Sequence, residues 1–262
     1  MSPKANAVSV VREPDLATTL VKGLSVLEVF SPAEPLLGNS EIALRTGLTR
    51  PTAARLTRTL ASLGYLRYDS DRAKYRLGAG VLSLANPLLA EIRVHQIARP
   101  LMQELAVSLK ANISMGLMNG LDAVYIECVR VAETEAFSAE IGARLPLSRS
   151  AIGFALISML APSEQTSLVA KLLSQRADAK AAVKSALAHV QEKGFAISRG
   201  DWAPPVHAVA VPLMREPTTG AYLAINCGVP SFRLRPGELE NEMGPRLAAL
   251  AASIRALCAR YS

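Results

Sequence analysis

The spacing of apolar residues changes along this chain and divides it into two parts. Up to about residue 110, apolar positions recur every three or four residues, which predicts amphipathic helices. Beyond that point, short alternating runs between turn signals predict strands mixed with further helices. This order of elements predicts an α+β fold, with helices grouped around an antiparallel sheet. Helices are expected at 18–30, 40–46, 50–63, 78–91, 94–110, 150–160, 163–173, 180–193 and 236–261, and strands at 112–118, 123–131, 137–141, 195–198, 207–214 and 221–227.

Residues 36–77 have the pattern of a winged helix–turn–helix. Gly47 suits the tight turn between two short helices, because such a turn needs a positive φ. Ser40 is expected to cap the first helix, which buries Ile42 and Leu44. After the second helix, alternating residues on both sides of the polar turn 69–72 predict a β-hairpin, the wing.

The second helix separates apolar from basic side chains. Thr49 suits its N-cap, and Ala53, Leu56, Leu60 and Leu63 share one side. Arginines occupy the opposite side, as binding in the major groove of DNA requires. Alone, these arginines could be an ordinary solvated face, but the turn, the cap and the wing favour DNA binding. The candidate DNA contacts are Thr49, Arg50, Thr52, Arg55 and Arg58, with Arg72 and Lys74 of the wing on phosphates.

The charge distribution agrees with a polyanionic partner. Residues 41–80 hold eight basic and three acidic residues, so they carry +5 of the formal net charge of +7. Residues 81–262 are nearly balanced, with eighteen basic and fifteen acidic residues. Positive charge concentrated on one segment favours double-stranded DNA as the partner of that segment.

The sequence offers no catalytic constellation. The three histidines are dispersed, and no metal-ligand spacing, nucleophile motif or phosphate loop is present, so we expect no metal and no cofactor. Three widely spaced cysteines without a CxxC pair favour a reducing cytoplasm. The chain contains neither a signal-peptide pattern nor an apolar run long enough for a membrane span. Function is therefore expected to come from binding.

The segment from Ser148 to Gly153 opens a helix in the second part. Free N–H groups and the positive end of the helix dipole make this start a candidate site for a carboxylate-bearing metabolite. The alternative is an ordinary capped helix start in which Gly153 allows close packing.

Several stretches together resemble the IclR family of bacterial transcriptional regulators, from Thr18 to Tyr261. They are LTRPTAARLTRTLASLGYL (48–66), KYRLGAGVLSLA (74–85), GARLPLSRSAIGFALIS (142–158), GFAIS (194–198) and VHAVAVPL (206–213). The resemblance implies an N-terminal winged helix–turn–helix and a C-terminal GAF-like effector-binding domain. It also implies homodimers that pair into tetramers, and small organic acids as effectors.

Carried over by position, the resemblance assigns an effector pocket. Compared with acid-binding members, this chain has Ser198 in place of an acidic residue, Ala208 in place of a cysteine, and Asn226 and Gly228 in place of serines. Fewer polar side chains imply a larger or more apolar acid. The pocket residues are Ser150, Ala151, Ile152, Gly153, Ser198, Ala208, Asn226 and Gly228, with Leu145 and Leu147 as an apolar lid.

These observations predict a cytoplasmic, DNA-binding transcriptional regulator without enzymatic activity, whose operator binding responds to a small organic acid. One alternative is a ligand-independent regulator that uses its second domain for oligomerisation, and another is an enzyme with a fused regulatory domain. The predicted organisation is a flexible arm (1–16), the winged helix–turn–helix (17–78), a linker helix (79–93) and the GAF-like domain (94–262).

Overall fold

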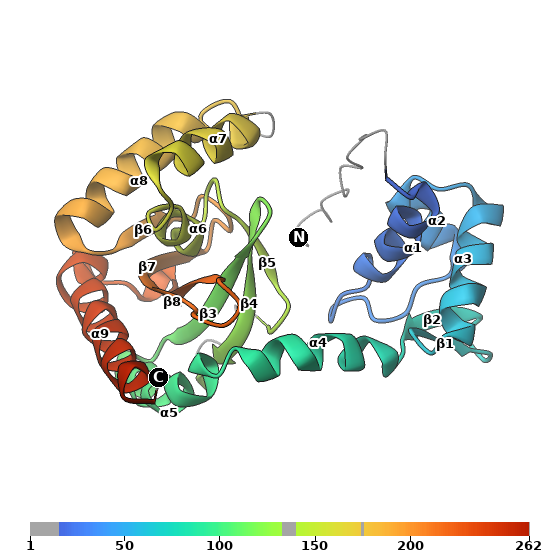
Figure 1. Cartoon of the computed structure of the whole chain (residues 1–262), viewed down its shortest axis with the longest axis horizontal. Helices are drawn as coiled ribbons and strands as arrows, with labels where there is room; N and C mark the ends of the chain where they lie inside the picture. Colours follow the sequence, from blue (N-terminus) through green and yellow to red (C-terminus); the bar gives the residue numbers. More distant parts are fainter. Residues whose placement is uncertain (1–15, 133–139, 174–175, 262) are drawn as a thin grey trace. The chain divides into compact units, whose positions relative to one another are not determined.

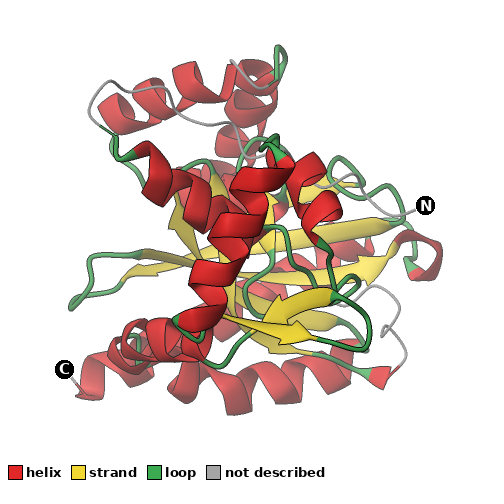
Figure 2. Ribbon diagram, turned by 90° about the vertical axis from the view of Figure 1, so that its right-hand side faces the viewer, coloured by secondary structure: helices red, strands yellow, loops and turns green. Residues whose placement is uncertain are grey.

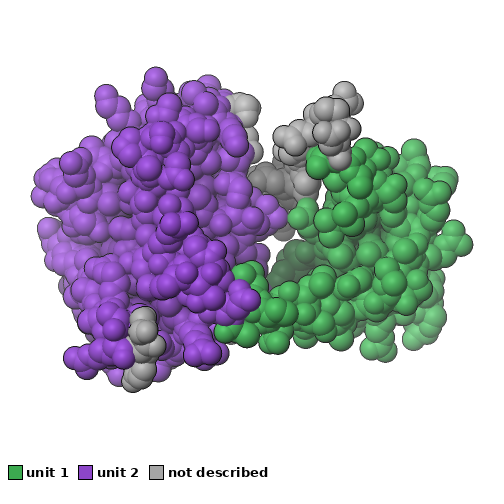
Figure 3. Space-filling model, viewed as in Figure 1, with its two compact units in different colours: residues 1–90 green, residues 91–262 purple. Residues whose placement is uncertain are grey.

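The computed structural model describes residues 16–132, 140–173 and 176–261 (Figure 1). It divides into two compact units, residues 1–90 and 91–262 (Figure 3), and the division falls inside the segment predicted as the linker helix. Almost all of the predicted arm, and most of the strand predicted at 137–141, lie outside the described residues.

The first unit is a winged helix–turn–helix. Its elements are α1 (Thr18–Glu28), α2 (Asn39–Thr46), α3 (Arg50–Ser62), β1 (Leu66–Asp69), β2 (Lys74–Leu77) and α4 (Gly80–Glu91). Val26, Ile42, Ala53 and Leu66 are buried in one core, so each of α1, α2, α3 and the wing contributes to it. The wing is an antiparallel pair in which Tyr68 lies opposite Tyr75.

Two expectations for this unit were wrong. Helix α2 is not capped by Ser40: its N-cap is Gly38, whose N–H donates to Glu41 Oε2 at 2.7 Å. Leu44 is 85% exposed, because α2 is short and turns only Ile42 and Ala43 toward the core. The turn glycine was predicted correctly, since Gly47 has φ +67°.

The second unit is built on a six-stranded antiparallel sheet in the order β5-β4-β3-β8-β7-β6. Helix α6 packs on one face, with α7 and α8 outside it, while α5 and α9 cover the other face (Figures 1 and 2). The helices are α5 (Val94–Leu109), α6 (Ala151–Ile157), α7 (Pro162–Leu173), α8 (Ala179–Lys193) and α9 (Gly244–Tyr261). The strands are β3 (Asn112–Asn119), β4 (Asp122–Val129), β5 (Arg144–Pro146), β6 (Ala196–Arg199), β7 (Val206–Arg215) and β8 (Tyr222–Pro230).

Side chains alternate in direction along each strand, so only every second residue faces α6. Tyr125 on β4, Ala210 on β7 and Ala224 on β8 share a buried cluster with α6, so we call this side the α6 face. Successive strand residues point to opposite sides, so Val209 and Ile225 point to the side covered by α5 and α9.

The sequence missed two features of this unit. Residues 144–146 form the edge strand β5, where no strand was predicted. The C-terminal helix does not begin at residue 236: a short π-helical segment, Leu239–Met243, precedes α9. Regular α geometry begins at Gly244, where a Cβ atom would come within 2.5 Å of the Phe195 ring.

Candidate nucleic-acid interface and effector pocket

Helix α3 begins with a polar cap that fixes its first turn. Thr49 has extended backbone angles, and its Oγ1 accepts from the N–H of Thr52 at 3.4 Å. The two hydroxyl groups of Thr49 and Thr52 also lie 2.9 Å apart. Pro51 is tolerated in this turn because its missing N–H would have had no helical acceptor. Thr49 is exposed and Thr52 half-buried, so both remain accessible at the start of the helix.

The arginines of α3 are exposed on the side away from the core. Arg50, Arg55 and Arg58 are exposed, whereas Ala53 and Leu56 of the same helix are buried. The Nε of Arg58 donates to the carbonyl of Ala54 at 3.2 Å, which holds this side chain along the helix. Within the ranges that the structure describes, no carboxylate pairs with these three guanidinium groups. Their positive charge therefore faces solvent.

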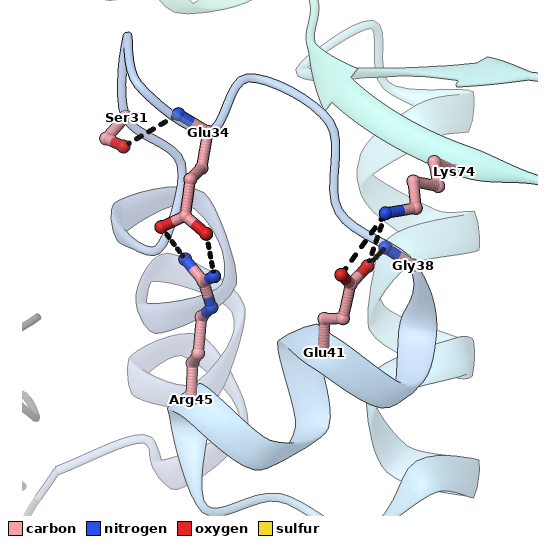
Figure 4. Close-up of polar contacts among 6 residues, drawn as sticks. All are labelled: Ser31, Glu34, Gly38, Glu41, Arg45 and Lys74. Carbon is pink, nitrogen blue, oxygen red and sulfur yellow. Dashed lines mark hydrogen bonds and ion pairs between the residues drawn. The ribbon is translucent and has the colours of Figure 1, made fainter. Parts of the chain in front are cut away.

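The basic residues of the wing are held by carboxylates. Arg72 and Arg76 both contact Asp69 Oδ2, at 3.3 and 3.2 Å. Lys74 Nζ lies 3.0 Å from Glu41 Oε2 and joins the wing to α2 (Figure 4). Figure 4 also shows Glu34 paired with Arg45, which fastens the loop before α2. Arg72 and Lys74 therefore lie at the wing, as the sequence predicted, but each has an acidic partner that DNA would have to replace.

Glu41 is a local electrostatic centre of this unit. The N–H of Gly38 and then the ammonium group of Lys74 hold the pKa of Glu41 below its ordinary value. The anion lies in the first turn of α2, where the helix dipole favours negative charge. One carboxylate thus both caps α2 and orients the wing.

In the second unit, strand register brings several predicted pocket residues together. Ser198, Ala208 and Gly228 are direct cross-strand neighbours on β6, β7 and β8. Asn226 lies in the adjacent row of the same face, between Ser114 on β3 and Ala210 on β7. The chain therefore places residues that are distant in sequence on one small area of the α6 face.

The start of α6 lies over this area and is satisfied locally. Ser150 Oγ accepts from the N–H of Gly153 at 3.1 Å and donates to the carbonyl of Pro146 at 2.8 Å. Ser198 Oγ donates to the carbonyl of Arg149 at 3.1 Å, which ties β6 to the residues before α6. Ala151 and Ile152 are almost fully buried.

Leu145 and Leu147 lie in the core. They are 5% and 0% exposed, and both belong to the buried cluster beneath α6. Leu145 pairs with Ala123, and Ala123 pairs with Met118. Leu145 therefore lies near the opposite end of the strands from Gly228. The structure does not bring Leu145 into the row of Ser198, Ala208 and Gly228.

Three buried or half-buried polar residues at this place were not predicted. Ser114 and Cys128 lie opposite each other on β3 and β4, and the side chain of Asn226 acts to lower the pKa of the Tyr125 hydroxyl. Burial raises the pKa of the Tyr125 hydroxyl and that of the Cys128 thiol, so both groups are uncharged at neutral pH. Knowing which residues lie across the sheet from Asn226 would have identified these three residues. That knowledge requires the strand register, which the sequence alone does not fix.

Family models match both units of the chain. The model of the IclR helix-turn-helix domain matches residues 19–70, and the model described as bacterial transcriptional regulator IclR C-terminal matches residues 87–256. The chain belongs to the IclR family. It is therefore a helix–turn–helix transcriptional regulator with an effector-binding C-terminal domain, as the resemblance in its sequence implied.

Individual relatives agree with this membership over nearly the whole chain. The HTH-type transcriptional regulator TsaQ1/TsaQ2 of Comamonas testosteroni is 30% identical over 92% of this chain and 88% of its own length. An IclR family regulator from Brucella abortus is 36% identical, with a TM-score of 0.78 over 95% of this chain and 96% of that one. An IclR homologue from Microbacterium hydrocarbonoxydans, solved with 4-hydroxybenzoate, shares the fold at 22% identity, with a TM-score of 0.69 over 91% of this chain and 99% of that one.

Three further findings on this IclR-family protein concern metal ions, membranes and a second hollow. Among the described residues, no group of three or more His, Cys, Asp or Glu side chains could hold a metal ion. In that same part of the chain, no helix is long and apolar enough to cross a membrane. A hollow of about 210 Å³ lies away from the predicted pocket, near Lys110, Arg233 and Glu242. There Arg235 pairs with Glu238 and Glu242, so much of the charge is already neutralised.

Proposed function

We propose that this IclR-family regulator binds operator DNA through α3 and the wing, and that a small organic acid bound on the α6 face changes this affinity. The observation that carries the proposal is the exposed side of α3, where Arg50, Arg55 and Arg58 lack carboxylate partners among the described residues. Arginine forks suit guanine edges and phosphates in the major groove. Because the partner is chromosomal DNA, we infer that the protein acts in the cytoplasm. Because its relatives are transcriptional regulators, we also infer that it has no enzymatic activity.

The proposed DNA contacts fall into two classes. The start and exposed side of α3 read base edges, while the wing contacts the phosphate backbone. Before they contact phosphate, Arg72 and Lys74 must break their ion pairs with Asp69 and Glu41. We therefore expect the contribution of the wing to DNA affinity to depend strongly on salt. The proposed residues are Thr49, Arg50, Thr52, Arg55 and Arg58 for bases, and Arg72 and Lys74 for phosphates.

The proposed effector pocket comprises the row of Ser198, Ala208 and Gly228, together with Asn226 and the start of α6. Small and apolar walls with few polar groups suit an organic acid with a sizeable apolar body. Support comes from the family neighbour solved with 4-hydroxybenzoate, and from the relative in Acinetobacter baylyi named as the p-hydroxybenzoate hydroxylase transcriptional activator. Ser150–Gly153, Leu145 and Leu147 are proposed to act as the supporting wall, since they are buried.

We further propose that the protein works as a homodimer, or a dimer of dimers, joined in part through α4. This helix has no buried residue within its own chain, although it is rich in leucine. Leu82, Leu84 and Leu88 are 73%, 60% and 46% exposed, and Leu77 just before them is 42% exposed. Such a helix gains stability by packing against an identical surface, and a two-fold dimer matches a two-fold DNA site.

The experiment for this function is a titration of the full chain against a duplex from its own promoter region, with and without candidate acids. The proposal predicts specific binding at physiological salt and a saturable change in affinity with at least one acid. A regulator whose DNA affinity does not respond to any acid would instead use its second unit for assembly alone.

A further inference from the structure

One buried acceptor in the second unit lacks a donor. Asn226 is only 7% exposed, and among the described residues its Oδ1 has no hydrogen-bond partner. Buried amide oxygens are nearly always paired, because leaving one unpaired costs the hydrogen bond that water would have made. An orphaned acceptor of this kind marks a place where a donor from outside the chain fits.

Two pairs of polar side chains lie beside or near Asn226. The side chain of Asn226 acts on the Tyr125 hydroxyl and lowers its pKa, against the larger effect of burial. Ser114, directly opposite Asn226 on β3, likewise lowers the pKa of the Cys128 thiol on β4. Neither Tyr125 nor Ser114 donates a hydrogen bond to Asn226 Oδ1, which is left as an open acceptor.

Residues of β8 on the α6 face become more exposed just beyond Asn226. Ala224, two residues earlier on β8, is fully buried, whereas Gly228, two residues later, is half-buried. A Cβ atom at Gly228 would meet only Val206 Cγ1, at 3.9 Å. Ala208 beside it is also half-buried. Open space therefore lies above Gly228, on the same face of β8 as Asn226 and two residues further along the strand.

We propose that Asn226 selects an effector bearing a hydroxyl group, by accepting a hydrogen bond from that hydroxyl at Oδ1. This inference rests on the proposed effector pocket and narrows its ligand to a hydroxylated organic acid. A site built to accept a hydroxyl proton discriminates against an analogue that lacks it, since Oδ1 then stays unpaired.

The test uses the full chain and two matched pairs of acids. Calorimetric titration compares 4-hydroxybenzoate with benzoate, and 4-hydroxybutyrate with butyrate. In at least one pair, the hydroxylated acid is expected to bind at least tenfold more tightly, as expected when a buried polar group is left unpaired. The O-methylated analogue, 4-methoxybenzoate, cannot donate and is expected to bind like benzoate or more weakly.

Two variants test whether Asn226 is the source of the preference for the hydroxylated acid. Asn226→Leu keeps the approximate side-chain size and removes the acceptor, so it should abolish the difference between the paired acids. Asn119→Leu removes an exposed amide at the end of β3 and should leave the difference unchanged. Equal binding of both members of each pair to the unaltered chain overturns the inference, and so does failure of all the acids to bind. The comparison on the unaltered chain does not depend on the folding of any variant.

Parallel DNA titrations separate this inference from the proposed function. If an acid without a hydroxyl group changes DNA affinity as strongly as its hydroxylated partner, the effector-responsive function stands and the role of Asn226 is wrong. If the chain shows no preference for its promoter region, the proposed function itself fails, whatever the acids do.

Discussion

Gly153 lies so close to Leu147 that a Cβ atom at position 153 would come within 2.4 Å of the Leu147 Cα. The first turn of α6 therefore packs directly on the backbone before it. This contact supports the packing interpretation of Gly153, while Ser150 uses its hydroxyl to cap the same turn. The helix start forms a rigid wall beside the row of Ser198, Ala208 and Gly228.

Gly153→Ala is expected to destabilise the second unit by about 1–3 kcal/mol, the usual cost of overpacking a closely packed core. Gly228→Ala is the matched control, because its added methyl group meets only Val206 Cγ1 at 3.9 Å. Urea unfolding followed by circular dichroism measures both. Equal stability of the two variants would show that α6 can move away from Leu147 without cost.

Arg55→Ala is expected to weaken specific DNA binding by about 1–3 kcal/mol, as loss of an arginine that reads a base edge does. Lys184→Ala on α8 removes the same charge far along the chain and should change affinity little. Fluorescence anisotropy with a promoter duplex gives both values. Unchanged affinity of the Arg55 variant would remove this residue from the interface.

Glu41→Gln is expected to lower the stability of the first unit at neutral pH, by about 0.5–1 kcal/mol, because it weakens the cap on Gly38 and the pair with Lys74. The side chain is 46% exposed, so water screens the pair and keeps the effect small. The pKa of Glu41 is depressed in the folded protein, so ionised Glu41 stabilises the fold at pH values above the ordinary carboxyl pKa. This stabilisation is lost as the pH falls through the lower pKa that Glu41 has in the folded state.

Urea unfolding of Glu41→Gln and the unaltered chain over a series of pH values checks this sign. The two stabilities should converge in acid, and a gap that widens as the pH falls would contradict the account. The same variant should bind DNA more tightly at low salt, because Lys74 then has no anionic competitor for phosphate.

Leu84→Glu is expected to weaken self-association through α4 without unfolding the chain, because Leu84 is 60% exposed within its own chain. Sedimentation over a range of concentrations measures the change, and circular dichroism confirms folding. Val107→Glu on α5, which is also 60% exposed, is a control of matched exposure. If Leu84→Glu associates like the unaltered chain, α4 does not join the copies.

Local sequence signals predicted the first unit well, because each of its features is encoded within a few residues. Gly47 signals the turn, Thr49 the N-cap and residues 69–72 the wing. The errors at Ser40 and Leu44 arose because a carboxylate, Glu41, supplies the cap, and because so short a helix buries only one side. Helical periodicity alone cannot tell how wide that buried side is.

The candidate pocket was only partly predictable. Ser198, Ala208 and Gly228 came from resemblance, and strand register then showed that they are neighbours. Tyr125 and Ser114 were missed because their relation to Asn226 depends on long-range pairing that no local pattern encodes. Edge strand β5 was missed because three residues are too few to show alternation.

The most direct test of the account is the affinity of the full chain for a duplex from its own promoter region, compared with a random duplex of equal length at the same physiological salt. The account predicts that the promoter duplex binds at least about a thousandfold more tightly, as specific regulators do. It also predicts that a hydroxylated organic acid changes this preference in a saturable way. Equal affinity for the two duplexes, with and without the acids, would contradict it.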